Sequence, residues 1–134
     1  FCASQTYPNQ YCNVKQPENL TQHRILSMAD EHLDQHIVVH DDQSQQKKIR
    51  VNPIIMGSDL TMLAQLVSQD CGIALLPDSI VQDYLKSGEL VRVLPEWKAP
   101  HGILHAVYPS RRGLLPAVRV FIDYLVASFN PAKI

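Results

Sequence analysis

Hydrophobic residues recur along the chain with two different periods, and these periods predict alternating strands and helices. Short apolar or alternating runs predict strands over residues 1–4, 24–28, 36–40, 48–52, 73–76, 90–94 and 103–108. Apolar residues three and four apart predict helices that begin at Ser58, Asp78 and Pro116, and Pro17 opens a short helix that ends near His23. This alternation is typical of a layered α/β domain.

Polar and glycine-containing stretches predict where these elements end. Residues 41–46 are the most polar part of the chain and predict a hairpin tip, after which the strand over 48–52 is expected to continue through 53–56. Ser58 is expected to cap the following helix with its hydroxyl, and Gly72 to end that helix in a left-handed conformation. Asp78 is expected to cap the next helix.

The last predicted helix has one strongly apolar stripe. If buried, each side chain of the stripe would contribute about 1.5 to 3 kcal/mol. The stripe therefore indicates that a second lobe, in the same protein or in another molecule, covers Val118, Phe121, Ile122, Leu125 and Phe129.

Composition narrows the class of protein. The 134 residues are 46% hydrophobic and 19% charged, which predicts one soluble domain with a substantial core. Prolines interrupt the apolar runs, so no membrane span is predicted. Cys2, Cys12 and Cys71 show neither a C-x-x-C pair nor even spacing, and we expect a reducing, cytoplasmic environment.

Charge gives little support for direct contact with DNA. The formal net charge is -1, and lysine and arginine cluster only over residues 47–50 and 111–112. Nucleic-acid binding domains usually carry a longer basic stripe. These residues alone are not expected to grip DNA.

No pattern in the sequence predicts an enzyme, a metal site or a cofactor. His36 and His40 stand four apart, but the β-branched run between them favours a strand, and no third ligand has suitable spacing. The turn at Ser58 lacks the second glycine of a nucleophile elbow. The five glycines form no phosphate-binding loop.

Two polar pairs remain as candidates for ligand binding. Ser4 with Thr6, and Ser58 with Asp59, each follow an apolar strand near the start of a helix, where open α/β sheets place ligands. Helix capping alone would explain the same residues. The pattern leaves both interpretations open.

An ordered series of segments makes the chain resemble the effector-binding domain of LysR-type transcriptional regulators. The clearest is Cys71-Gly72-Ile73-Ala74-Leu75-Leu76-Pro77, followed by the run over residues 85–97. The other matching segments are residues 3–7, 17–20, 58–59, 106–112 and 118–125.

The resemblance implies a Rossmann-like lobe of the type II periplasmic-binding-protein fold, with a C-terminal helix that belongs to a second lobe. It implies that residues 1–4 and 106–109 are the two hinge strands. Residues 5–105 would then form lobe II, and residues 110–134 the C-terminal part of lobe I.

The resemblance also implies a function. A small-molecule effector in the cleft between the lobes would shift the arrangement of a homodimer or homotetramer and so change transcription. DNA would be bound by a domain absent from these residues. The expected effector contacts are Ser4, Gln5, Thr6, Val39, Ser58 and Asp59, and the expected dimer contacts are Thr61, Gln65, Ser68 and Gln69.

One alternative shares the same architecture. A lobe of an extracytoplasmic solute-binding protein would require a secretion signal and would tolerate oxidation. The three unpaired cysteines favour the regulator.

Overall fold

The computed structural model describes residues 1–7, 14–29, 36–100, 107 and 115–128. The chain forms two compact units, residues 1–100 and residues 101–134. The first unit contains β1 (Cys2–Ser4), the 3-10 helix η1 (Pro17–Gln22), β2 (Ile25–Met28), β3 (His36–His40), β4 (Gln46–Arg50), β5 (Pro53–Gly57), α2 (Leu60–Ser68), β6 (Ile73–Ala74), α3 (Asp78–Ser87) and β7 (Leu90–Arg92). The second unit contains α4 (Pro116–Ser128).

A five-stranded sheet organises the first unit, with its strands in the order β5-β2-β6-β1-β7. Strand β2 pairs in parallel with both β5 and β6. Strand β1 lies antiparallel between β6 and β7. The sheet is therefore doubly wound, with one antiparallel strand inserted between its third and fourth parallel strands.

Different layers cover the two faces of this sheet. Helices α2 and α3 pack side by side on one face, where Leu26 and Ala74 belong to their hydrophobic cluster. The antiparallel hairpin β3–β4 and η1 cover the other face, where Ile25 and Ile73 are buried. The connections between parallel strands are right-handed. The connection from β2 to β5 and the connection from β5 to β6 run in opposite directions across the sheet, so they lie on opposite faces of it.

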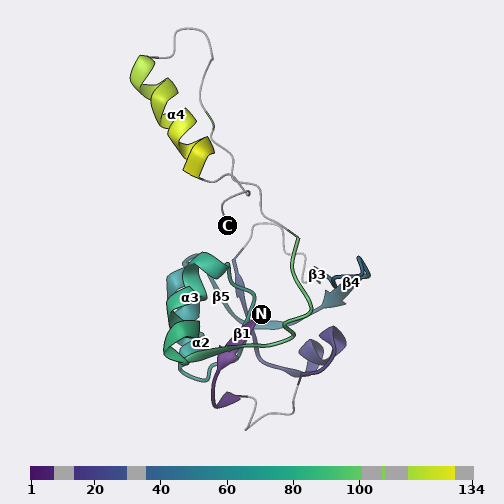
Figure 1. The fold of residues 1–134 in the computed structure, drawn as a ribbon. Coiled ribbons are helices and arrows are strands. Elements are labelled where there is room, and N and C mark those ends of the chain that lie inside the picture. The colour runs from purple at the N-terminus through teal and green to yellow at the C-terminus, as the bar shows by residue number, and fades with distance from the viewer. Residues whose placement is uncertain (8–13, 30–35, 101–106, 108–114, 129–134) are drawn as a thin grey trace. The chain divides into compact units, whose positions relative to one another are not determined.

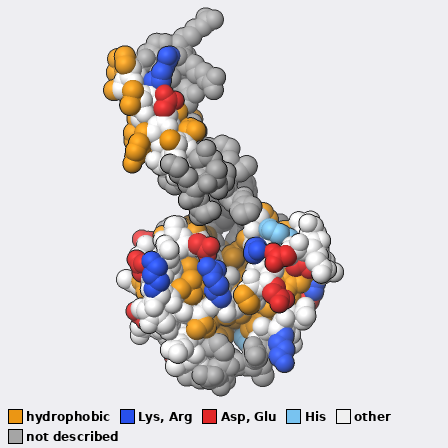
Figure 2. Space-filling view, viewed as in Figure 1, with side chains coloured by type: hydrophobic (Ala, Val, Ile, Leu, Met, Phe, Trp, Pro, Cys, Tyr) orange, Lys and Arg blue, Asp and Glu red, His pale blue; other side chains and the backbone are white. Residues whose placement is uncertain are grey.

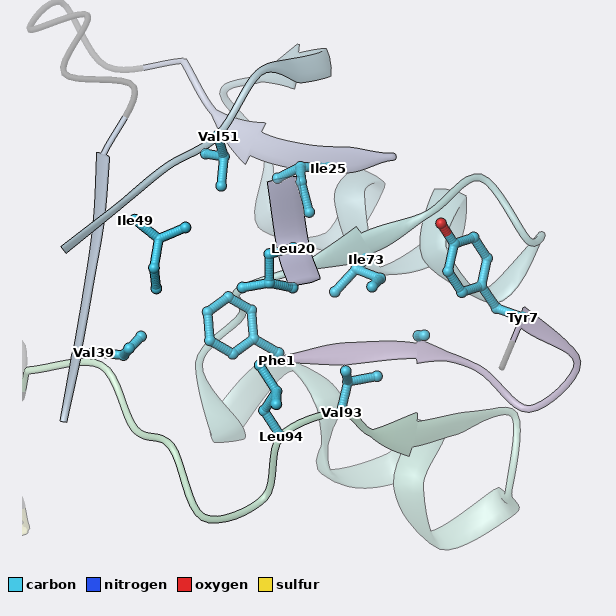
Figure 3. Close-up of a cluster of buried hydrophobic side chains, with 11 residues drawn as sticks. Phe1, Tyr7, Leu20, Ile25, Val39, Ile49, Val51, Ile73, Val93 and Leu94 are labelled. Carbon is cyan, nitrogen blue, oxygen red and sulfur yellow. The ribbon is translucent and has the colours of Figure 1, made fainter. Parts of the chain in front are cut away.

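The cluster beneath the hairpin joins residues that are far apart in the sequence. Figure 3 shows Phe1 beside Leu94, with Val39 and Ile49 reaching toward them from the hairpin. The cluster also includes Ala3, Tyr7, Leu20, Ile25, Val51, Ile73 and Val93. Burial of these side chains holds the hairpin against the sheet.

Most predicted elements are confirmed, but one predicted boundary is wrong. Residues 53–56 do not continue the hairpin strand β4. They form β5, which pairs with β2 in the five-stranded sheet. β-branched residues flank Asn52 on both sides, at Ile49 and Val51 before it and at Ile54 and Ile55 after it, so the change of sheet there leaves no periodic signal. The predicted strand over 103–108 lies, except for Val107, outside the described residues.

The helix ends differ from expectation in three places. The residue that caps α2 is Asp59, not Ser58, because its carboxylate accepts hydrogen bonds from the backbone N–H groups of Thr61 and Met62. Asp78 is the first residue of α3 and makes no capping hydrogen bond. After α2, the left-handed residue is Asp70, with φ 63°.

Gly72 is nevertheless required, for a different reason. Its φ is +153°, and a Cβ at this position would lie 2.3 Å from the carbonyl oxygen of Arg24. The chain passes so close to β2 here that only glycine fits.

Helix α4 begins at Pro116, as predicted, and buries none of its side chains. Val118, Ile122 and Leu125 are half-buried, whereas Phe121 is 59% exposed. Figure 2 shows exposed hydrophobic side chains on α4, together with basic and acidic side chains. Phe129, the last residue of the predicted stripe, lies outside the described residues.

Candidate functional site

The direction of β1 separates the two polar pairs that the sequence singles out. We call the edge at which β2, β5 and β6 end the carboxyl edge, and the opposite edge the amino edge. Because β1 is antiparallel to β6, Ser4 lies at the amino edge, whereas Ser58 and Asp59 follow β5 at the carboxyl edge. The strands span about 10 Å. The structure therefore does not bring the two pairs into one site.

Ser4 and Thr6 form a hydrogen-bond cluster with Asp70. Both hydroxyls donate to Oδ1 of Asp70, the Thr6 bond measuring 2.5 Å. Ser4 is 2% exposed, and its Oγ also accepts a bond from the N–H of Tyr7 at 3.0 Å. This cluster joins the turn after β1 to the turn after α2, which is a structural role.

The Tyr7 side chain extends the same structural region. Its hydroxyl accepts a hydrogen bond from the N–H of Arg24 at 3.3 Å and lies 3.4 Å from Nδ1 of His23. Burial lowers the pKa of His23. The amino edge is thus braced by side chains that bond to one another.

Sequence reasoning missed Asp70, although it is central to the cluster. The hydroxyls of Ser4 and then Thr6 lower the pKa of Asp70 below its ordinary value of 3.8, because they stabilise the ionised carboxylate. An aspartate just beyond a helix is a local signal, since aspartate tolerates the left-handed conformation better than most residues. The pairing with Ser4, 66 residues away, has no local signal.

Two other expected effector contacts, Val39 and Gln5, lie away from the carboxyl edge, one in the core and one at the amino edge. Val39 is fully buried in the cluster beneath the hairpin, with 0% exposure, so its side chain presents no surface to a ligand. Gln5 is exposed at the amino edge, and its N–H donates to the carbonyl of Glu89 at 3.3 Å.

The carboxyl edge presents a different set of groups. Ser58 and Asp59 are exposed there, before the first turn of α2. Met28 pairs in register with Gly57 and is 40% exposed, and Met62 is 42% exposed. The Met62 methyl group would lie 2.7 Å from a Cβ added at Gly57. A hydroxyl, a carboxylate and two thioether side chains therefore gather at this edge.

One ion pair lies at the same carboxyl edge, beside β7, the outermost strand at the end of the sheet opposite β5. Nη2 of Arg92, at the end of β7, lies 3.0 Å from Oδ1 of Asp78 at the start of α3. Both side chains are largely exposed, so the pair contributes little to stability.

The outer face of α2 contains the expected dimer contacts. Thr61, Gln65 and Gln69 are exposed, and Ser68 is half-buried with its hydroxyl donating to the carbonyl of Gln65. Leu63, Ala64 and Val67 face the core. The expected face is thus available on the surface of the first unit.

Within the described residues, no three histidine, cysteine, aspartate or glutamate side chains gather in a way that could hold a metal ion. A search of the same residues finds no helix with the length and apolarity needed to cross a membrane.

Comparison with known proteins identifies the family. A family model described as the LysR substrate binding domain matches residues 1–130. An HTH-type transcriptional regulator from Xanthomonas campestris pv. campestris is 30% identical over 131 residues, which is 96% of this chain and 38% of that protein. The chain thus spans about two fifths of that relative.

Solved structures agree with the family match. The CrgA regulatory domain, from a LysR-type transcriptional regulator of Neisseria meningitidis, is 27% identical with a TM-score of 0.72, and the match covers 94% of this chain and 62% of that one. The regulatory domain of AphB from Vibrio vulnificus is 25% identical with a TM-score of 0.73, covering 94% and 63%.

These relatives are transcriptional regulators and not enzymes. They support the regulator over the alternative of a solute-binding lobe. Together with the doubly wound sheet and its inserted antiparallel strand, the matches show that the chain belongs to the LysR substrate-binding domain family, with the Rossmann-like, type II periplasmic-binding-protein fold.

Proposed function

We propose that the chain is the effector-sensing and oligomerisation domain of a cytoplasmic LysR-type regulator, and that its effector binds at the carboxyl edge. One observation carries this proposal: Ser58 and Asp59 are exposed after β5, beside the end of β2 and one strand away from β6, and the strand order reverses between β2 and β6. Open α/β sheets bind ligands at such a point. The proposed site omits Ser4, Gln5 and Thr6, which lie at the amino edge, and Val39, which is buried in the core.

The domain boundaries implied by the family resemblance complete the proposal. Residues 1–4 and 106–109 would be the hinge strands between lobe II, over residues 5–105, and lobe I. Residues 110–134 would supply the last part of lobe I, whose remainder would cover the apolar face of α4.

The signal would then be a shift in population. An effector that binds one arrangement of the lobes more tightly than another favours that arrangement in a homodimer or homotetramer. A DNA-binding domain elsewhere in the regulator would respond to the change. The shift is limited by the difference in affinity between the two arrangements.

A thermal-shift screen of the full-length regulator against small aromatic and aliphatic carboxylates and amines tests the site. A compound at one hundred times its dissociation constant stabilises the folded protein by about 2.7 kcal/mol. That stabilisation raises the melting temperature by several degrees. We expect Ser58→Ala to reduce or abolish the increase for the active compound.

Ser87→Ala is the matched control, because Ser87 is an exposed serine at the end of α3, at the amino edge. It should leave the increase unchanged. If Ser58→Ala responds like the wild type, the proposed position of the effector is wrong. If no compound stabilises the folded regulator, the sensing role itself is contradicted.

A further inference from the structure

The chain turns sharply after β7, at a residue with unfavourable backbone geometry. Val93 donates its N–H to the carbonyl of Phe1 at 3.0 Å, which ends the sheet pairing. Leu94 then adopts a φ of 53°, in the left-handed region. A branched side chain disfavours this conformation, which persists only where the surroundings hold it. Leu94 is 5% exposed, in the cluster beneath the hairpin.

The segment after this turn pairs with the two-stranded sheet that β3 and β4 form, called the small sheet below. Trp97 donates its N–H to the carbonyl of Leu94 at 2.9 Å and so closes the turn. His40 and Lys98 then exchange two backbone hydrogen bonds, each 2.9 Å long. Nζ of Lys98 also lies 2.6 Å from Oδ1 of Asp42 at the hairpin tip. Residue 98 therefore pairs with the edge of the hairpin as a short third strand would.

A charged side chain covers Trp97 from the hairpin. Nζ of Lys47 lies 4.8 Å from the centre of the indole ring and 2.8 Å from Oε1 of Glu18 on η1. Trp97 also packs against the cluster that contains Val39 and Ile49. Residues 94–98 are thus held by backbone bonds, an ion pair, a cation–π contact and hydrophobic packing.

This segment lies immediately before the end of the first unit at Pro100. We infer that the β3–β4 hairpin clamps residues 94–98 and thereby limits the directions in which the chain leaves the first unit for the second. The clamp makes the hairpin a positioning element for movement between the two units. Its regulatory meaning rests on the proposed function, but the constraint itself requires no effector.

Distances between spin labels in the two units of the full-length regulator test the clamp. Labels at Gln82→Cys on α3 and Arg119→Cys on α4 use two exposed positions. Cys12, Cys71 and any accessible cysteine in the rest of the regulator are replaced by serine. Cys2 is retained, because it is 1% exposed and burial raises the pKa of its thiol. Dilution with unlabelled protein removes distances between subunits.

Two variants weaken the clamp by different means. Lys47→Met removes the charge over the indole ring and keeps much of the apolar stem. Lys98→Pro removes the N–H that is donated to His40. Lys48→Met is the matched control, since Lys48 pairs with Val38 on the outward side of the same strand. Trp97 is the only tryptophan in these 134 residues, and any tryptophan elsewhere in the regulator is replaced by phenylalanine. Acrylamide quenching of Trp97 then reports whether the clamp has opened.

We expect the distance distribution to broaden in at least one clamp variant, with increased quenching of Trp97, and to match the wild type in Lys48→Met. Distributions of unchanged width in both clamp variants would overturn the inference, whatever the quenching shows. Equal broadening in the control would also overturn it, because the effect would then be a general loosening of the hairpin. Effector binding plays no part in these outcomes, so the inference and the proposed function fail separately.

Discussion

Two residues beyond α2, Asp70 and Gly72, determine the path of the turn that leads to β6. Asp70 takes a left-handed conformation and receives the hydroxyl hydrogen bonds of Ser4 and Thr6. Gly72, two residues later, lets the chain pass against the backbone of Arg24. The turn between α2 and β6 is therefore set by a side chain at one residue and by the lack of one at another.

Gly72→Ala should destabilise the first unit by about 3 kcal/mol or more, because the new Cβ would meet a backbone carbonyl that cannot easily move. Gly88→Ala is the control. Its φ is also positive, at +80°, but nothing lies within 4 Å of the added Cβ, so only the conformational cost of about 1 kcal/mol remains. Urea denaturation of both variants measures the difference. Equal losses would show that the close approach to Arg24 does not limit this position.

Asp70 should also make stability depend on pH. Its pKa is lower in the folded protein than its ordinary value of 3.8, so the carboxylate stabilises the fold above about pH 4. That contribution is lost as the pH falls through the folded-state pKa. Asp70→Asn keeps a residue that tolerates the left-handed conformation. The stability difference between wild type and variant should shrink in acid, as denaturation at several pH values would reveal; a difference independent of pH would contradict the assignment.

At the scale of elements, the two residues before α2 have different roles: Asp59 stabilises the helix, and Ser58 is exposed without capping it. The Asp59 carboxylate satisfies two N–H groups that the helix would otherwise leave unpaired. Ser58 makes no comparable bond to the helix, so its hydroxyl is available to a ligand in a way that a capping hydroxyl is not.

Asp59→Ala should therefore lower the free energy of unfolding by about 1 kcal/mol, the usual loss for a helix cap. Ser58→Ala should change it by much less, because Asp59 and not Ser58 is the cap. Denaturant titrations compare the two variants directly. A larger loss in Ser58→Ala would return the capping role to the serine and weaken the case for an effector contact.

Elements with a strong period or turn signal could be predicted from the sequence. The polar tip over residues 41–46 predicted the hairpin, and the apolar spacing after Asp59 predicted α2. What could not be predicted depends on distant pairing. No local pattern states that β5 leaves the small sheet or that β1 runs antiparallel to β6, and the second fact divides the expected site between two edges.

At the scale of the whole molecule, α2 places two surfaces close together. Its first turn borders the proposed effector site, and its outer face holds the proposed dimer contacts. Binding at the carboxyl edge would therefore act on the same helix that we propose as the contact with a neighbouring subunit. Such proximity gives an effector a short physical path to the oligomer.

Gln65→Arg should weaken association of the full-length regulator by at least about tenfold, or 1.4 kcal/mol, because it places a charge in the proposed interface. Gln82→Arg makes the same change on the exposed side of α3, outside that face. Sedimentation equilibrium of both variants provides the measurement. If both variants associate equally well, the outer face of α2 is not the contact between subunits.

The position of β1 also has a consequence for how the protein is made. Ser4 pairs with Leu90, a residue synthesised much later. At about 5 to 20 residues per second, the ribosome needs roughly 4 to 17 s to cover that interval. Until β7 emerges, the apolar strand at residues 2–4 has no partner on that side. The nascent chain must therefore be shielded from aggregation for longer than a protein whose neighbouring strands follow one another along the sequence.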